Sequence, residues 1–306
     1  SLNQTLAALG RGYFSRWPNV KTMAASTQMR WRHRYWHLVK NEGFVKNPAN
    51  IDIVQALADI GWTAALTGEP GSGLDFLYMH RQMIHHVDMM LSNANDPNWG
   101  KVEGWSNIPA MPDDPDWPEP QISNIDNPTA WPENIRDTIE AIAGARSAEA
   151  LTTNMGYATT LRDPAFLTRP DITLDKYGEL IEITVHNWMH MRFAASPPAD
   201  FEDESTANDW LGAPFSSHVN KYFWKLHGWI DDCIGLWEIE NEKQADFSSA
   251  WRAPEEAPPW DDLLPTPAAE MAIRKSKAPL FGPLQPFAAS PSAIKSAQQV
   301  IESHKK

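Results

Sequence analysis

Two pairs of histidines, each separated by three residues, constrain this chain more than any other feature of its sequence. His33 and His37 lie in a stretch from 19 to 42 without Gly or Pro, and His186 and His190 lie in a second stretch of helical pattern. Residues four apart share one face of an α-helix, so each pair can direct two imidazoles toward one metal ion. A single pair of this kind is often incidental, and each pair needs a third ligand from elsewhere in the chain.

Two further histidines are candidates for those third ligands. His80 lies in FLYMHRQMIHHVD and His227 lies in YFWKLHGWIDD, both in the middle of predicted helices with apolar neighbours. Four helices would then present six imidazoles to one core, as helical bundles with metal sites do. Six nitrogen ligands favour copper or zinc over magnesium or calcium. The alternative is that His80 and His227 are ordinary buried histidines bonded to the backbone.

The remaining pattern predicts a mainly α protein, a helical bundle with long loops rich in Pro and Trp. We expect one helical domain over 1–252, with a loop insertion at 97–132, and a Pro-rich C-terminal tail at 253–306 that packs on the same domain. Helical periodicity and end signals predict the following segments. The predicted helices are 19–42, 50–68, 74–92, 132–150, 174–193, 217–243, 267–276 and 291–304.

Composition excludes several classes of partner and site. The 26 basic and 39 acidic residues give a net charge of −13, which argues against nucleic acid or an anionic membrane as a partner. Cys233 is the single cysteine, so a disulfide framework or a Cys-rich metal site is excluded. No apolar stretch is long enough for a membrane span. We expect a soluble protein; the sequence leaves its compartment open, with the cytoplasm as the expectation.

Four short strings surround the six histidines. They are His33-x3-His37-Leu38-Val39; Tyr78-Met79-His80-x-Gln82-Met83, followed by Asp88; His186-Asn187-x2-His190; and Phe223-Trp224-x-Leu226-His227-x-Trp229-Ile230-Asp231-Asp232. In order, spacing and neighbours, these strings resemble the copper domain of the type 3 copper proteins, especially the arthropod hemocyanins and prophenoloxidases and the tyrosinase-like oxidases. The resemblance covers roughly 20–92 and 174–243.

The resemblance implies a dicopper centre and a reaction with molecular oxygen. The first copper would be held by His33, His37 and His80, and the second by His186, His190 and His227. Family members bind oxygen as a side-on peroxide between the two coppers. They hydroxylate phenols, or oxidise o-diphenols to quinones and o-aminophenols to quinone imines. The implied partners are therefore a small aromatic substrate and oxygen, and the resemblance also allows a copper-delivery partner and a homo-oligomer.

Two alternatives to an oxidase remain open. The strings are equally compatible with a hemocyanin-like protein that binds oxygen reversibly without catalysis, although the compact chain favours an enzyme. The other alternative is a helical scaffold whose histidines are incidental.

The resemblance also suggests residues beyond the ligands. Asn187 occupies the position of an Asn that orients a water for deprotonation of a monophenol, with Glu182 as its carboxylate partner and Glu179 as the second choice. Phe223 resembles an aromatic residue that stacks near substrate. Plain structural alternatives exist: a solvated helix residue for either Glu, and a core residue for Phe223.

Several features depart from the family pattern or remain unassigned. The chain is too short for the flanking domains of the arthropod proteins, so we expect a more open site unless the 97–132 loop or the tail covers it. Asn220-Lys221 replaces an Asp-Pro, and Cys233 lies outside the position of a His–Cys crosslink.

Asp88 and Asp231 are candidate helix-stabilising acids or surface charges. We expect four histidines to lie outside the ligand set: His85, His86, His218 and His304.

Overall fold

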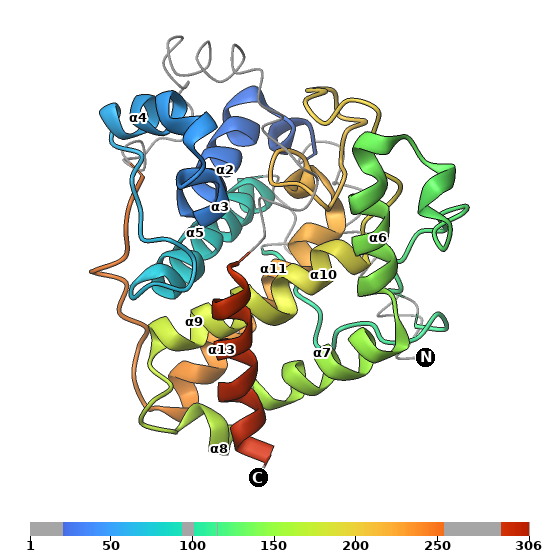
Figure 1. Cartoon of the computed structure of the whole chain (residues 1–306). Helices are drawn as coiled ribbons and strands as arrows, with labels where there is room; N and C mark the ends of the chain where they lie inside the picture. The colour runs from blue at the N-terminus through green and yellow to red at the C-terminus, as the bar shows by residue number, and fades with distance from the viewer. Residues whose placement is uncertain (1–20, 94–100, 115, 254–288, 306) are drawn as a thin grey trace.

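The computed structural model describes residues 21–93, 101–114, 116–253 and 289–305. Within these ranges the chain is mainly helical and contains no β-strand, which confirms the predicted α class (Figure 1). The α-helices are α2 (Thr27–Lys40), α3 (Glu42–Val45), α4 (Ile51–Asp59), α5 (Ser72–Asn93), α6 (Arg136–Ala145), α7 (Ala148–Thr160), α8 (Pro164–Leu167), α9 (Leu174–Ile181), α10 (Asn187–Arg192), α11 (Lys221–Glu240) and α13 (Pro291–Glu302). The other helical segments are η1 (Pro48–Asn50), η2 (Pro128–Ala130), η3 (Glu133–Ile135), η4 (Glu182–His186), η5 (Ser217–Val219) and η8 (Ser303–Lys305).

The helices predicted at 74–92, 217–243 and 291–304 correspond to α5, to η5 with α11, and to α13 with η8. The prediction of a continuous helix over 19–42 is wrong, because residues 25 and 26 interrupt it and Ser26 caps α2 by accepting a hydrogen bond from the Met29 amide. The predicted 132–150 helix is divided between α6 and α7, and Ser147 caps α7 in the same way. The predicted helix at 267–276 lies outside the described residues.

A second difference concerns the helix predicted at 174–193. It is observed as α9, η4 and α10 in direct succession, and η4 is a π-helical turn that ends at His186. A π-helical turn inserts an extra residue into the helix and is found often at functional sites. Side chains before η4 therefore project in a different direction from those that a continuous α-helix would align with the residues after it. His186 and His190 still lie on one face of the helix.

Helix α5 packs against α9 and α11. The α5–α9 crossing is close because it has glycine on both sides: a Cβ added to Gly178 would collide with the carbonyl group of Gly73. An ion pair joins α5 to α11, since Arg81 Nε donates to Asp231 Oδ1 at 2.6 Å. Asp88 accepts a hydrogen bond from the Val102 amide, so both acids bind structural partners.

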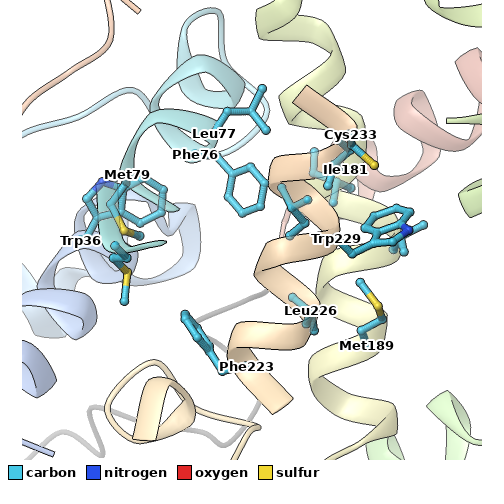
Figure 2. Close-up of a cluster of buried hydrophobic side chains, with 14 of the residues drawn as sticks. Trp36, Phe76, Leu77, Met79, Ile181, Met189, Phe223, Leu226, Trp229 and Cys233 are labelled. Carbon is cyan, nitrogen blue, oxygen red and sulfur yellow. The ribbon is translucent and has the colours of Figure 1, made fainter. Parts of the chain in front are cut away.

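Helix α11 begins at Lys221 and is capped by Asn220, whose side chain accepts a hydrogen bond from the Tyr222 amide at 2.9 Å. Asn is a favourable N-cap residue, and it supplies the helix start at the position where the family pattern has Asp-Pro. Apolar side chains of α11, including Phe223, Leu226 and Trp229, point into the core (Figure 2). The helix start and this buried face together fix the position of His227.

The C-terminal helix α13 packs against α9 and η4, with Ala297 and Ile301 fully buried (Figure 1). Residues 101–114 and 116–127 form turns and bends without a helix. This segment contacts α11 beside His227, because the Trp105 amide donates to the Lys225 carbonyl and Gly104 lies against Gly228. Within the described ranges, every helix is too short or too polar to cross a bilayer.

Candidate metal centre

Four helical stretches bring six histidines together in the interior. His33 and His37 come from α2 and His80 from α5; His186 ends η4, His190 lies in α10, and His227 lies in α11. All six side chains are between 0 and 4% exposed. The structure thus places the six predicted ligands together in one buried region.

Two pairs of imidazole nitrogens converge within this group. His37 Nε2 lies 3.2 Å from His33 Nε2, and His186 Nε2 lies 3.2 Å from His227 Nε2. Two nitrogens bound to one ion at about 2.0–2.1 Å, with an angle between a right angle and a tetrahedral one, are about 2.9–3.4 Å apart. Both pairs therefore have the separation that two ligands of one metal ion require.

The opposite ring nitrogens are held by carbonyl oxygens. His80 Nδ1 lies 2.9 Å from the Phe76 carbonyl, His190 Nδ1 lies 2.7 Å from the Leu211 carbonyl, and His227 Nδ1 lies 2.7 Å from the Phe223 carbonyl. His186 Nδ1 lies 3.0 Å from Asn187 Oδ1. These oxygens only accept hydrogen bonds, so Nδ1 carries the hydrogen and the lone pair of a neutral ring is on Nε2. Metal-binding histidines are oriented in this way in proteins.

The environment keeps the imidazoles neutral. Burial lowers the pKa of His80 to about 3 and that of His190 to about 4. Burial, followed by neighbouring histidines, holds the pKa of His33 and His186 well below the usual range. A neutral ring is the form that binds a metal ion, and Nε2 of His80 has no hydrogen-bond partner among the described residues. The buried lone pairs thus fit a metal ion as their missing partner.

The division of the six into two sets of three is less regular than the sequence predicts. Ligand atoms of His33, His37 and His80 lie within 4.8 Å of one another, and so do those of His80, His186 and His227. His80 therefore lies between the two groups, with its ring stacked on that of His227 at 4.4 Å. His190 lies beside the second group, with its ring centroid 4.6 Å from that of His186 and 5.4 Å from that of His227.

A seventh histidine reaches the site. His218 in η5 is fully buried, and its Nδ1 lies 3.0 Å from His33 Nδ1. His218 is not among the predicted ligands, but it contacts the predicted ligand His33 directly. No helical spacing links His218 to His33, so only the tertiary fold reveals the contact. His85 is exposed, and His304 faces Asp163.

The three predicted non-ligand residues lie in distinct environments. Asn187 orients His186, as described above. Glu182 is buried, and burial raises its pKa to about 7, against the opposing effect of Lys40. Phe223 is fully buried; its ring stacks on His227 at 3.7 Å and meets His33 edge-on at 5.5 Å.

The donor set is one that copper, zinc, iron and nickel all accept, because each binds neutral imidazole. The geometry thus supports metal binding by these histidines, while the choice of metal depends on further argument. No protein-family model and no curated protein matches this chain.

Proposed function

We propose that the protein is a dicopper oxidase or monooxygenase that uses molecular oxygen on phenols, o-diphenols or o-aminophenols. The observation that carries the proposal is the convergence of two Nε2 pairs, each 3.2 Å apart, from four helical stretches of one buried core. The sequence resemblance to type 3 copper proteins adds the choice of copper. When bound, two copper ions supply the electrons and the Lewis acidity that oxygen activation requires.

Residues of the chain orient the histidine rings and exclude water from the core around them. Carbonyl acceptors at Phe76, Leu211 and Phe223 fix the ring orientation of their histidines, so little reorganisation accompanies metal binding. The aromatic rings of Trp36, Phe76 and Phe223 pack against the histidines and keep water from the core.

Asn187 and Glu182 are proposed to serve proton transfer. A phenol has a pKa near 10 and must lose its proton before its oxygen can bind a metal ion. Asn187 Oδ1 accepts a hydrogen bond from His186, which holds the side-chain amide beside a metal ligand, where an amide N–H can orient a water. Glu182, with a pKa of about 7, is suited to accept the phenolic proton near neutral pH.

A specific observation favours the second candidate, reversible oxygen binding without catalysis. The six histidines and Phe223 are almost completely buried, and the cavity that reaches His33 has a volume of about 10 Å³. That volume holds one water-sized molecule, so an aromatic ring needs movement of the surrounding side chains. Molecular oxygen is much smaller than an aromatic ring, so its entry needs less movement of these side chains.

The experiment that separates the candidates uses copper-loaded protein under oxygen. Consumption of oxygen and product formation are measured with tyrosine, L-DOPA and 2-aminophenol, and oxygen release under vacuum is measured without substrate. The enzyme proposal predicts turnover of at least one of these aromatic compounds. Reversible oxygen binding without consumption of any of them would support the carrier instead.

A further inference from the structure

A small cavity beside His33 has an unusual lining. Its walls are the side chains of Met29, Arg32, His33, Trp36, Met79 and Met83. We name it the thioether cavity, after its three methionines. Two helices build it, because Met29, Arg32, His33 and Trp36 belong to α2, whereas Met79 and Met83 belong to α5.

Helical spacing directs the three thioethers to one place. Met29 precedes His33 by four residues, and Met79 precedes Met83 by four residues, so each pair shares one helix face. All three methionines are buried, with exposures of 3 to 6%, and Figure 2 shows Met79 next to Trp36. The cavity therefore lies between three methionine side chains and the edge of the histidine site.

The size of the cavity selects its occupant. A volume of about 10 Å³ corresponds to one water molecule or one ion, and it excludes an aromatic substrate. Arg32 is the only partly exposed residue of the lining, so it lies at the solvent side, with His33 at the inner side. The cavity thus has room for an ion but not for an aromatic substrate.

The chemistry of the lining residues determines which ions the cavity can bind. Thioether sulfur is a soft ligand that prefers Cu(I) and is a poor ligand for hard cations such as Mg²⁺ and Ca²⁺. The indole face of Trp36 attracts a cation through its π electrons. The positive charge of Arg32 repels a divalent ion twice as strongly as a monovalent one at the same distance. The thioether ligands and the charge of Arg32 favour Cu(I) over Cu(II), whereas the indole face attracts either cation.

We propose that the thioether cavity is the route by which Cu(I) reaches His33 and the adjoining ligands during metal loading. This inference rests on the proposed dicopper function. The methionines would bind Cu(I) weakly and transiently, and the ion would then be transferred to His33. The competing explanation is that the three methionines only fill an irregular gap in the core, as flexible thioethers do elsewhere.

The test compares rates of Cu(I) uptake by the apo form of the full chain. Cu(I) is supplied as its bicinchoninate complex under anaerobic conditions, and the loss of chelate absorbance gives the rate. The variant is the double substitution Met29→Leu and Met83→Leu, which removes two sulfur atoms while keeping apolar volume. Met155→Leu, in α7, is the matched control.

We expect the double variant to take up Cu(I) about tenfold more slowly than the wild type, with the same final copper content. Uptake of Cu(II) and the behaviour of Met155→Leu should not change. An unchanged Cu(I) rate in the double variant would overturn the route. A wild-type protein that fails to retain stoichiometric copper would instead overturn the dicopper function, so the two failures are distinguishable.

A second measurement does not depend on any variant. Apo wild-type protein with ¹³C-methyl-labelled methionine is titrated with Ag(I), a soft monovalent ion that is not oxidised by air. The methyl resonances of Met29, Met79 and Met83 should shift first, while that of Met155 stays in place. Absence of these early shifts would refute binding of soft ions in the thioether cavity.

Discussion

His218 lies where it would support His33, a proposed metal ligand, without itself binding the metal. For Nε2 of His33 to accept a metal ion, Nδ1 must carry the hydrogen and needs an acceptor. Burial lowers the pKa of His218 to about 3, so His218 is neutral and its Nδ1 can be that acceptor, 3.0 Å away. In the proposed metal site, His218 would have the role for His33 that backbone carbonyls have for His80 and His227.

Replacing His218 should weaken one metal position selectively. We expect His218→Phe, which keeps a ring but removes the acceptor, to lower the affinity of the copper beside His33 by about 10–100-fold. The affinity at His186 and His227 should be retained. Competition with a chromophoric chelator measures both affinities, with His85→Asn at an exposed position as the control. Equal affinities in wild type and His218→Phe would exclude this role.

The raised pKa of Glu182 predicts that the free energy of unfolding depends on pH. Its pKa is about 7 in the folded protein, against an ordinary value of 4.5 for a solvated glutamate, as in the unfolded chain. Because the folded pKa is raised, the unfolded chain loses its proton first as pH rises above 4.5, and the free energy of unfolding falls until about pH 7. The shift corresponds to a loss on the order of 3 kcal/mol.

The variant Glu182→Gln cannot ionise and should escape this loss. Relative to the wild type, its free energy of unfolding should rise by about 2–3 kcal/mol between pH 5 and pH 8, measured by urea denaturation. Glu149→Gln, at an exposed position of α7, is the matched control. A difference between variant and wild type that stays constant with pH would show that Glu182 is not the titrating group.

Asn187 and Glu182 also predict a difference between substrates. If they orient the water that removes a phenolic proton, Asn187→Ala and Glu182→Gln should slow monophenol hydroxylation by about 10²-fold or more and affect o-diphenol oxidation less. Steady-state rates on tyrosine and L-DOPA, corrected for copper content, measure the two reactions. Equal losses on both substrates would point to a general disturbance of His186 rather than to proton transfer.

At the scale of helices, the close crossing of α5 and α9 determines the distance between the helical stretches that carry His80 and His186. Gly73 and Gly178 meet backbone to backbone, and α5 carries His80 while α9 leads directly to His186. Gly178→Ala must push the helices apart, so we expect it to reduce the free energy of unfolding by about 1–3 kcal/mol or more.

Urea denaturation gives that change, and Gly144→Ala provides the control. Gly144 is exposed in α6 with open space around its Cβ position, so Ala there should stabilise the protein by about 0.5–1 kcal/mol. Loss of stability at both positions would mean that the close crossing is not the cause.

Helical periodicity predicted the α class and the helices α5, α11 and α13, because long apolar faces leave few alternatives to a helix. The helix predicted at 50–68 is too long, since α4 ends at Asp59. Periodicity failed at local interruptions. The break at 25 and 26 depends on Ser26, a residue that is tolerated inside helices and becomes a cap only when the chain turns there. The π-helical turn at Glu182–His186 has no sequence signal that separates it from an α-helix.

For the whole molecule, the site could be predicted in part. The i, i+4 pairs identified His33 with His37 and His186 with His190, since both members lie on one helix. The apolar helix surroundings of His80 and His227 make them candidate third ligands, and the sequence resemblance assigns each of them to one of the two pairs. The contact of His218 with His33, and the position of His80 between the two groups, depend on how four helical stretches pack, which spacing along the chain does not encode.

The central claim is that these histidines hold two copper ions, and the copper content per chain tests it most directly. Wild-type protein, loaded and passed through a desalting column, should retain two copper ions per chain by elemental analysis. His37→Ala and His190→Ala should each retain about one, since each removes a ligand of a different ion. Wild-type protein with no stoichiometric copper, or an unchanged copper content in both variants, would contradict the account.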